Sequence, residues 1–246
     1  MERIDLETRS DGYFALFPER LLPRGLRAGI SLRAAGDMDP AKEDVLGNRG
    51  RLFRLLGVDP DRVLRVHQVH SRIVAAAESP SMGTGAWPEA DGITAGSGRA
   101  VLAVTVGDCL PVYLADGRTG AFALVHSGWK GTGIAVEAIA RMEERYGSRP
   151  EDLTAVLGPC IGPCCYGVPE DRWRSFLDAY GPRAALQAAD GKRRIDLRGA
   201  NAVLLERAGV RRIFAVDGCT CCDAAFGSFR REGPSFTRML SLLGGF

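Results

Sequence analysis

Apolar positions along the chain fall into two patterns, short runs that suit strands and longer stripes at helical spacing. Runs rich in β-branched residues between Gly, Pro or Asp predict strands, over residues 13–17, 28–32, 63–69, 73–77, 100–106, 112–115, 121–125, 153–157 and 213–216. Apolar residues three and four apart predict helices, over residues 39–57, 132–146, 170–180 and 198–208. A last apolar segment spans 236–243. The interleaving predicts one α/β (α+β) domain over residues 1–246 with a mixed sheet.

Two neighbouring apolar runs, around 104–113 and 123–131, carry a cysteine and a histidine at their ends. Cys109 closes one run and His126 closes the next. If the runs are neighbouring strands, a thiolate and an imidazole meet at one edge of a sheet. Such a pair is either part of a transition-metal donor set or a Cys/His nucleophile pair. In the simplest alternative, Cys109 is a small buried hydrophobe and His126 a hydrogen-bonded strand-end histidine.

The other two of the chain's three histidines, His67 and His70, lie in the run at 63–71. On a regular strand they would point to opposite faces, so one ion would not take both. Two imidazoles and one thiolate make three protein ligands, the number that leaves zinc an open position for water or substrate. The residues alone predict such a site without choosing between His67 and His70.

Length and composition are those of a globular protein with one sizeable core: 246 residues, 46% hydrophobic and 25% charged. No run reaches the roughly 18 apolar residues of a spanning helix, and the N-terminal residues are too polar for a signal peptide. We therefore expect a cytoplasmic protein without a membrane partner. A net charge of +2 and scattered Lys and Arg residues argue against nucleic acid. Short basic runs such as 192–194 are expected to be solvated turns.

The seven cysteines are expected to be reduced, because their number is odd and the chain is large. Adjacent cysteines diverge on an extended chain. No clean pair of Cys-x-x-Cys knuckles is present either, so we expect no second metal centre in the two cysteine clusters. A second metal or a redox pair is the alternative. The clusters are Cys160, Cys164 and Cys165, and Cys219, Cys221 and Cys222.

Six short motifs occur along the chain in one order: Gln68-Val-His70, Ala90-Asp-Gly-Ile-Thr94, Gly107-Asp-Cys-Leu-Pro-Val112, His126-Ser-Gly-Trp-Lys-Gly131, Gly158-Pro-Cys-Ile-Gly-Pro163 and Ser228-Phe-Arg-Arg231. In this order they resemble the YfiH-like, laccase-domain family, whose members are described as polyphenol oxidases and as purine nucleoside phosphorylases. The resemblance runs from about Gln68 to Arg238.

This resemblance implies a layered fold, with helices outside packed β-sheets and a metal at one end. It implies one zinc ion per chain on His70, Cys109 and His126, with copper the less favoured metal. It also implies purine nucleoside and phosphate as partners: phosphorolysis of adenosine, inosine or methylthioadenosine, and deamination of adenosine. Zinc in such a site polarises an oxygen or lowers the pKa of a water.

The chain departs from the family's usual pattern near the metal positions. Val106 stands where a threonine is usual, and Gly167 where a glutamate is usual. Phe226-Gly-Ser-Phe-Arg-Arg231 replaces Phe-Phe-Ser-Tyr-Arg-Arg, and Phe236-Thr-Arg238 replaces Thr-Gly-Arg. The metal residues are unchanged. Weak turnover and an altered substrate preference are therefore expected.

Residues beside the metal positions carry the expected substrate chemistry. Asp108 is a candidate acid/base acting with Cys109, or a carboxylate that orients a ligating imidazole. Ser127 and Lys130 lie in a turn before a helix, where backbone N–H groups and an ammonium would seat phosphate. Arg230 is a further candidate for phosphate. Alternatively, Lys130 is a solvated turn residue. The Ser/Gly/Pro-rich segment 78–88 is expected to be a loop over the site.

Three rival functions remain open at this point. Cys109 and His126 would suit a Cys/His-dependent hydrolase. A multicopper polyphenol oxidase needs more imidazoles than three histidines supply. A non-enzymatic metal- or nucleotide-binding module is the third. The oligomeric state is not indicated by the sequence.

Overall fold

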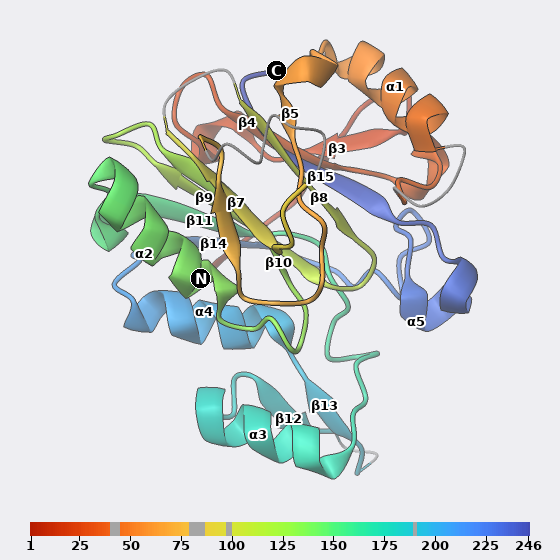
Figure 1. Cartoon of the computed structure of the whole chain (residues 1–246). Coiled ribbons are helices and arrows are strands. Elements are labelled where there is room, and N and C mark those ends of the chain that lie inside the picture. Colours follow the sequence, from red (N-terminus) through yellow and green to blue (C-terminus); the bar gives the residue numbers. More distant parts are fainter. Residues whose placement is uncertain (40–44, 79–86, 97–99, 189–190) are drawn as a thin grey trace.

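Two β-sheets packed face to face form the centre of the molecule (Figure 1). The computed structural model describes residues 1–39, 45–78, 87–96, 100–188 and 191–246. Within these residues the first sheet has seven strands, in the order β1 (Glu2–Ile4), β14 (Arg212–Val216), β11 (Leu153–Leu157), β9 (Leu110–Asp116), β10 (Phe122–Ser127), β7 (Gly92–Ala95) and β6 (Val74–Ala76). The second has six, in the order β2 (Glu7–Thr8), β3 (Phe14–Leu16), β4 (Arg27–Ser31), β15 (Met239–Gly244), β8 (Val101–Val106) and β5 (Val63–Leu64).

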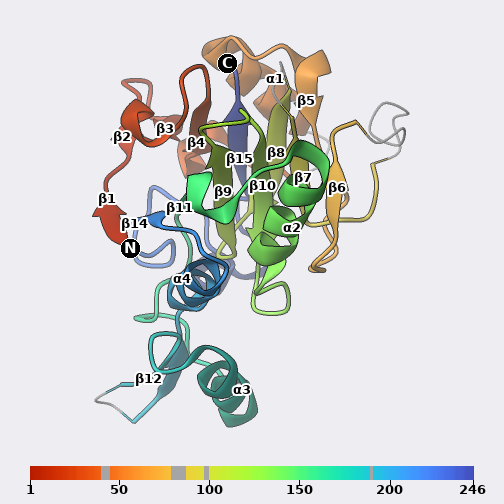
Figure 2. The ribbon, with the colours of Figure 1, turned by 90° about the vertical axis from the view of Figure 1, so that its left-hand side faces the viewer.

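Helices cover the outer faces of both sheets, as Figures 1 and 2 show. Helices α2 (Ile134–Tyr146) and α4 (Leu197–Arg207) pack on the first sheet, and α1 (Val45–Leu56) packs on the second. Helix α3 (Glu170–Tyr180) and the small sheet of β12 (Ala185–Gln187) and β13 (Arg193–Ile195) extend beyond α4, while α5 (Phe229–Glu232) lies at the opposite side. No helix in the described part of the chain combines the length and apolar character needed to cross a membrane.

Strand β9 shows why the central runs are apolar at nearly every position. Its Leu110, Val112 and Leu114 face the helices, while Tyr113 and Ala115 face the second sheet. Side chains alternate along a strand, so a strand covered on both faces must be apolar on both. All seven residues of β9 are buried.

The predicted layered α/β (α+β) architecture is confirmed, and most elements lie within two residues of their predicted positions. The strand predicted over 63–69 was too long, since only Val63–Leu64 pairs as β5 and His67 makes an isolated bridge to Glu89. The run 192–194, expected to be a turn, contributes to β13 because it pairs with β12. Of the predicted helix 39–57 and loop 78–88, residues 40–44 and 79–86 lie outside the described residues.

Tyr113 links the two sheets and gives a test of this packing. Its hydroxyl donates to the Gly29 carbonyl of the second sheet over 3.1 Å, and its fully buried ring stacks edge-on against Phe17. Tyr113→Phe removes one buried hydrogen bond and should lower the free energy of unfolding by about 1 kcal/mol. Tyr113→Ala also opens a cavity and should lower it by about 3–5 kcal/mol. Urea titrations measure both losses, and similar losses for the two variants would contradict this account.

Candidate metal centre and its cavity

Residues 107–109 carry the chain from β8 in one sheet to β9 in the other. Asp108 has a φ of 91°, which a non-glycine residue adopts only when its surroundings hold it there. Cys109 directly precedes β9, which runs antiparallel to β10 and pairs Pro111 with His126. The start of β9 and the end of β10 therefore lie at one edge, where Cys109 meets His126 from the start of a strand and not, as expected from the sequence, from the end of one.

Three donor atoms meet at this edge. One nitrogen each from His70 and His126 and the sulfur of Cys109 all lie within 4.8 Å of one another. The two imidazoles are nearly perpendicular, with ring centroids 4.9 Å apart. His67 is exposed and lies outside this group. His70 reaches the group because residues 65–73 leave the strand and its own φ is 59°.

Asp91, at the start of β7, fixes both histidine segments. Its Oδ1 accepts from His126 Nδ1 over 2.8 Å and from the His70 backbone N–H over 3.1 Å. Its Oδ2 accepts from the Ser71 N–H and hydroxyl over 2.6 and 2.8 Å. Burial favours the neutral acid, but the hydrogen bonds from His126 and Ser71 hold the pKa of Asp91 at about 2. Because Nδ1 of His126 is hydrogen-bonded to Asp91, Nε2 is the ring nitrogen available to the donor group.

The electrostatics of the donor group favour the thiolate. Burial opposes ionisation of Cys109, but the charge and hydrogen bonds of His126, assisted by His70, lower its pKa to about 6. Burial likewise disfavours the charged His126, while Cys109 and Asp91 raise its pKa to about 9. A Cβ added to Gly128 would lie 3.0 Å from Cys109 Sγ and 3.4 Å from a His70 ring carbon. Two imidazoles and a thiolate in this space fit a transition metal such as zinc.

A cavity of about 570 Å³ opens beside the donor group. Seven of its lining residues are aromatic or aliphatic, and the walls also carry three guanidinium groups and one carboxylate. The lining includes Gln68, Thr105, Val106, Asp108, Trp129, Ile161, Tyr166, Arg172, Leu197, Phe229, Arg230, Phe236 and Arg238. The three metal candidates line it as well. Val106 and Phe229, two of the departures from the family's pattern, thus face the cavity without the hydroxyl expected there.

Asp108 and Arg230 both line the cavity, and the hydrogen bonds of Asp108 within the described residues go to neither imidazole. Its Oδ1 accepts from the Thr220 hydroxyl over 2.7 Å, and its Oδ2 from the Arg230 N–H over 2.6 Å. The positive φ of Asp108 turns its side chain toward the C-terminal loops. The imidazole-orienting carboxylate is Asp91, which the sequence showed in a motif without indicating its role.

Ser127 and Lys130 lie outside the cavity lining, contrary to the predicted anion seat. Ser127 is the last residue of β10 and alternates with His126, so its hydroxyl points toward α4 and donates to Asn201 over 3.2 Å. Lys130 is exposed, with Nζ 5.6 Å from the Trp129 ring centroid. Helix α2 begins only at Ile134, later than predicted, which moves its N-terminus away from Lys130.

Arg172, at the start of α3, is a cavity residue that sequence reasoning missed. Its guanidinium carbon lies 3.9 Å from the Trp129 ring centroid. Its Nε is buried, and no described residue accepts a hydrogen bond from it. A buried N–H without an acceptor costs free energy unless a ligand or water supplies one. Nothing in the sequence distinguishes Arg172 from the other basic residues, because α3 is brought to the cavity only by the tertiary fold.

Comparisons with known proteins agree on one family. Residues 30–244 match the family model described as "Multi-copper polyphenol oxidoreductase laccase". The chain is 35% identical over 221 residues to a purine nucleoside phosphorylase of Deinococcus radiodurans, covering 89% of this chain and 83% of that protein. It is 33% identical over 217 residues to the purine nucleoside phosphorylase YlmD of Geobacillus stearothermophilus, covering 82% and 79%.

Solved structures extend the likeness to nearly the whole chain. The crystal structure of YlmD from Geobacillus stearothermophilus superposes with a TM-score of 0.88 at 28% identity, covering 98% of this chain and 99% of that one. The hypothetical protein YfiH of Bacillus licheniformis superposes with a TM-score of 0.87 at 27% identity, covering 97% and 98%.

The role of Asp91 can be tested by metal affinity. Asp91→Asn should weaken zinc binding at His70, Cys109 and His126 by about 10- to 100-fold, because the hydrogen bond that fixes a ligating imidazole is lost. Asp108→Asn, which touches neither histidine, serves as the matched control and should keep the parental affinity. Competition with a chromophoric chelator measures the change in zinc affinity. The step of zinc transfer that is absent from Cys109→Ala belongs to this site. Equal affinities in the parent and Asp91→Asn would refute the assignment.

Proposed function

The chain belongs to the multi-copper polyphenol oxidoreductase laccase family, and we propose that it is a zinc-dependent purine nucleoside phosphorylase that also converts adenosine to inosine. One observation carries this proposal. The cavity brings together a metal-donor group, aromatic faces and Arg172, whose buried Nε has no acceptor among the described residues. The names of the relatives, purine nucleoside phosphorylases, supply the substrate class.

The aromatic walls suit the purine base. Trp129, Tyr166, Phe229 and Phe236 all line the cavity, and Phe229 and Trp129 are 52% and 38% exposed. Exposed aromatic rings in a cavity offer stacking faces for a flat heterocycle. Phe229 and Phe236 already meet edge to face, with ring centroids 5.4 Å apart. Adenosine, inosine and methylthioadenosine share the base that these rings would hold.

Arg172 is the best-placed phosphate ligand. Arg230 already donates to the carbonyls of Cys165 and Gly167, and Arg238 pairs with Asp39 over 2.5 Å. Arg172 stacks on Trp129, and its buried Nε has no acceptor in the described part of the chain. Guanidinium groups bind phosphate through charge-assisted hydrogen bonds. Arg172, with Arg230 and Arg238 on the same walls, therefore takes the role that the sequence suggested for Ser127 and Lys130.

His70, Cys109 and His126 would hold the zinc. When bound, the ion supplies Lewis-acid chemistry that polarises a substrate or solvent oxygen. Asp91 keeps His126 in the tautomer that presents Nε2, and the low pKa of Cys109 provides the thiolate without a strong base. Asp108 lines the cavity one residue from Cys109 and holds the Arg230 backbone in place. Phosphorolysis needs a phosphate held near C1′ of the ribose, whereas deamination needs only an activated water at C6.

A Cys/His-dependent hydrolase is the second candidate, because Asp91, His126 and Cys109 also have the arrangement of orienter, base and nucleophile. The convergence of a second imidazole, His70, favours the metal instead, since a nucleophile needs one base only. A multicopper oxidase is not supported, because the whole chain has three histidines.

The proposed reactions can be followed by product analysis. With phosphate, zinc-loaded protein should release adenine or hypoxanthine and ribose 1-phosphate, and without phosphate it should convert adenosine to inosine. Cys109→Ala should lose both activities, because two imidazoles are too few protein ligands for tight zinc binding. His67→Ala is the control and should retain them. The missing hydroxyl at Val106 and carboxylate at Gly167 make slow turnover the expectation, so long incubations are needed. Zinc-loaded protein that forms no product above a metal-stripped sample, yet hydrolyses esters, would favour the hydrolase.

The phosphate site can be tested separately. Arg172→Gln should raise the KM for phosphate by about tenfold to hundredfold, because a charge-assisted hydrogen bond contributes about 1.5–3 kcal/mol. Deamination, which uses no phosphate, should change much less. Lys130→Gln is the matched control and should leave the KM for phosphate within about twofold of the parent, as expected for an exposed residue. If Lys130→Gln raised the KM for phosphate more than Arg172→Gln, the phosphate site would lie at the turn before α2 instead.

A further inference from the structure

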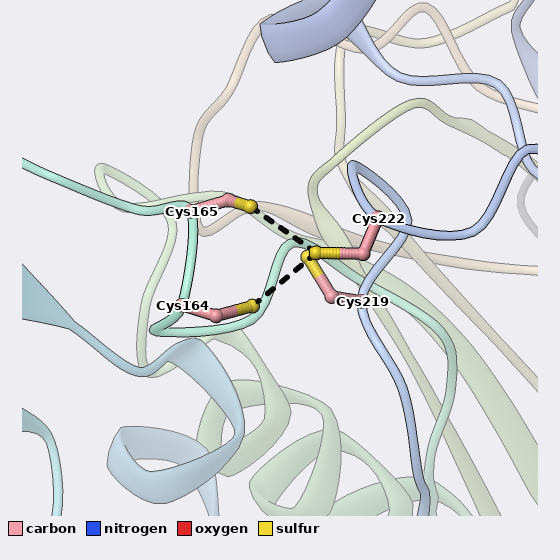
Figure 3. Close-up of side chains that lie close together, drawn as sticks. All are labelled: Cys164, Cys165, Cys219 and Cys222. Carbon is pink, nitrogen blue, oxygen red and sulfur yellow. Dashed lines mark hydrogen bonds between the residues drawn. The ribbon is translucent and has the colours of Figure 1, made fainter.

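Four cysteines outside the first donor group come together between two loops (Figure 3). Cys164 and Cys165 lie in the turn that follows β11, and Cys219 and Cys222 in the loop that follows β14. Their four sulfurs all lie within 4.8 Å of one another. Cys222 Sγ is 3.7 Å from Cys164 Sγ and 3.4 Å from Cys165 Sγ.

This convergence contradicts the expectation that adjacent cysteines diverge. That expectation assumed an extended chain, but residues 163–165 form a turn, closed by N–H groups of Cys165 and Tyr166 that donate to the Gly162 carbonyl over 3.0 and 3.1 Å. The turn aims both neighbouring sulfurs at the second loop. Cys219 and Cys222 have Cys-x-x-Cys spacing, and their loop is also closed by a turn, with the Cys222 N–H donating to the Cys219 carbonyl over 3.0 Å.

The spacing of the sulfurs is that of a tetrahedral metal site. Zinc–sulfur bonds of about 2.3 Å in a tetrahedron place the sulfurs roughly 3.8 Å apart. The separations of Cys222 Sγ from Cys165 Sγ and Cys164 Sγ, 3.4 and 3.7 Å, lie close to this value. A disulfide would require about 2.05 Å instead, and all four thiols are free. We propose that Cys164, Cys165, Cys219 and Cys222 bind a second, structural zinc ion.

The backbone at Gly162 supports the convergence of the sulfurs in two ways. The Gly162 N–H donates to Cys219 Sγ over 3.1 Å. Hydrogen bonds of this kind orient ligands and disperse their negative charge. A Cβ on Gly162 would lie 3.2 Å from Cys164 Sγ and 3.1 Å from Cys219 Cβ, so a side chain there would press into the cluster. Glycine at this position leaves room for the sulfurs to converge.

Cationic side chains offset the charge of the proposed site. Four thiolates and one Zn²⁺ carry a net charge of −2, which needs nearby positive groups. Arg194 Nη1 donates to the Cys164 carbonyl over 3.0 Å, and Arg230 Nη1 to the Cys165 carbonyl over 2.7 Å. Arg198 Nη2 lies 3.4 Å from the Cβ position of Gly162. Three guanidinium groups thus contact or approach the loop that carries Cys164 and Cys165.

The proposed ion would fasten one wall of the cavity. Thr220, between two of its ligands, donates to Asp108, and Tyr166, directly after Cys165, lines the cavity. A metal that joins the two loops would hold this wall of the cavity in place. This site stands on its own geometry and does not depend on the nucleoside chemistry proposed above.

Metal counting of four purified proteins tests the proposal. The parent should hold two zinc ions per chain, Cys109→Ala one, and the double variant Cys164→Ser/Cys222→Ser one. Cys221→Ser, a cysteine of the same loop that is not in the group of four, is the matched control and should hold two. Cobalt added to metal-stripped Cys109→Ala should give the strong near-ultraviolet thiolate-to-metal charge-transfer band of a four-sulfur site. Cys109→Ala protein that holds no zinc and gives no such band overturns the proposal, and iron in the site overturns its assignment to zinc.

Alkylation of the cysteines tests the same proposal without the double variant, in case that variant fails to fold. Cys164 and Cys222 are exposed thiols, which iodoacetamide can alkylate unless a metal holds them. In folded Cys109→Ala, both should react slowly until a strong chelator is added, and then at least about tenfold faster, with peptide mass spectrometry identifying the modified residues. Equal rates with and without the chelator, or a disulfide among the four in the untreated protein, would show that no ion is bound there.

Discussion

A buried carboxylate must either find hydrogen-bond donors or take up a proton, and Asp91 finds its donors in the two segments that supply the histidines. Its side chain is fully buried, and four hydrogen bonds from His70, Ser71 and His126 converge on it. Because a single side chain binds both segments, its hydrogen bonds hold the two imidazoles in place relative to each other.

The crossing between the sheets places Cys109 opposite these histidines. The chain passes from β8 to β9 within three residues, and the left-handed backbone of Asp108 makes the sharp change of direction possible. Asp108 is then tied to Thr220 and to the Arg230 backbone. Hydrogen bonds from the C-terminal loops stabilise this strained backbone conformation. Those loops also form the wall of the cavity and supply two of the four clustered sulfurs.

The donor group and the four-cysteine cluster use different parts of the same edge of the sandwich. In the donor group, imidazoles and a thiolate leave a coordination position unfilled by protein, which suits chemistry. In the cluster, four sulfurs would fill every position of a tetrahedral ion, which suits a structural role. Between them lie Asp108, Thr220 and Tyr166, so a change in either loop is transmitted directly to the cavity wall.

The sequence by itself determined the mixed α/β class and the convergence of Cys109 and His126, while the layering of the sheets was implied by the family resemblance. Apolar periodicity reports which faces are buried, and in an antiparallel pair the start of the first strand lies beside the end of the second. The selection of His70 over His67 needed the family resemblance, because local pattern treats both as strand residues. Only the tertiary structure decided that Asp91 binds both histidine segments. It also decided that Ser127 and Lys130 lie outside the cavity lining and that Arg172 lies within it. It also closed the turn that directs Cys164 and Cys165 to one point. These features join residues far apart in sequence or depend on single backbone angles, and neither leaves a periodic signal in the order of the amino acids.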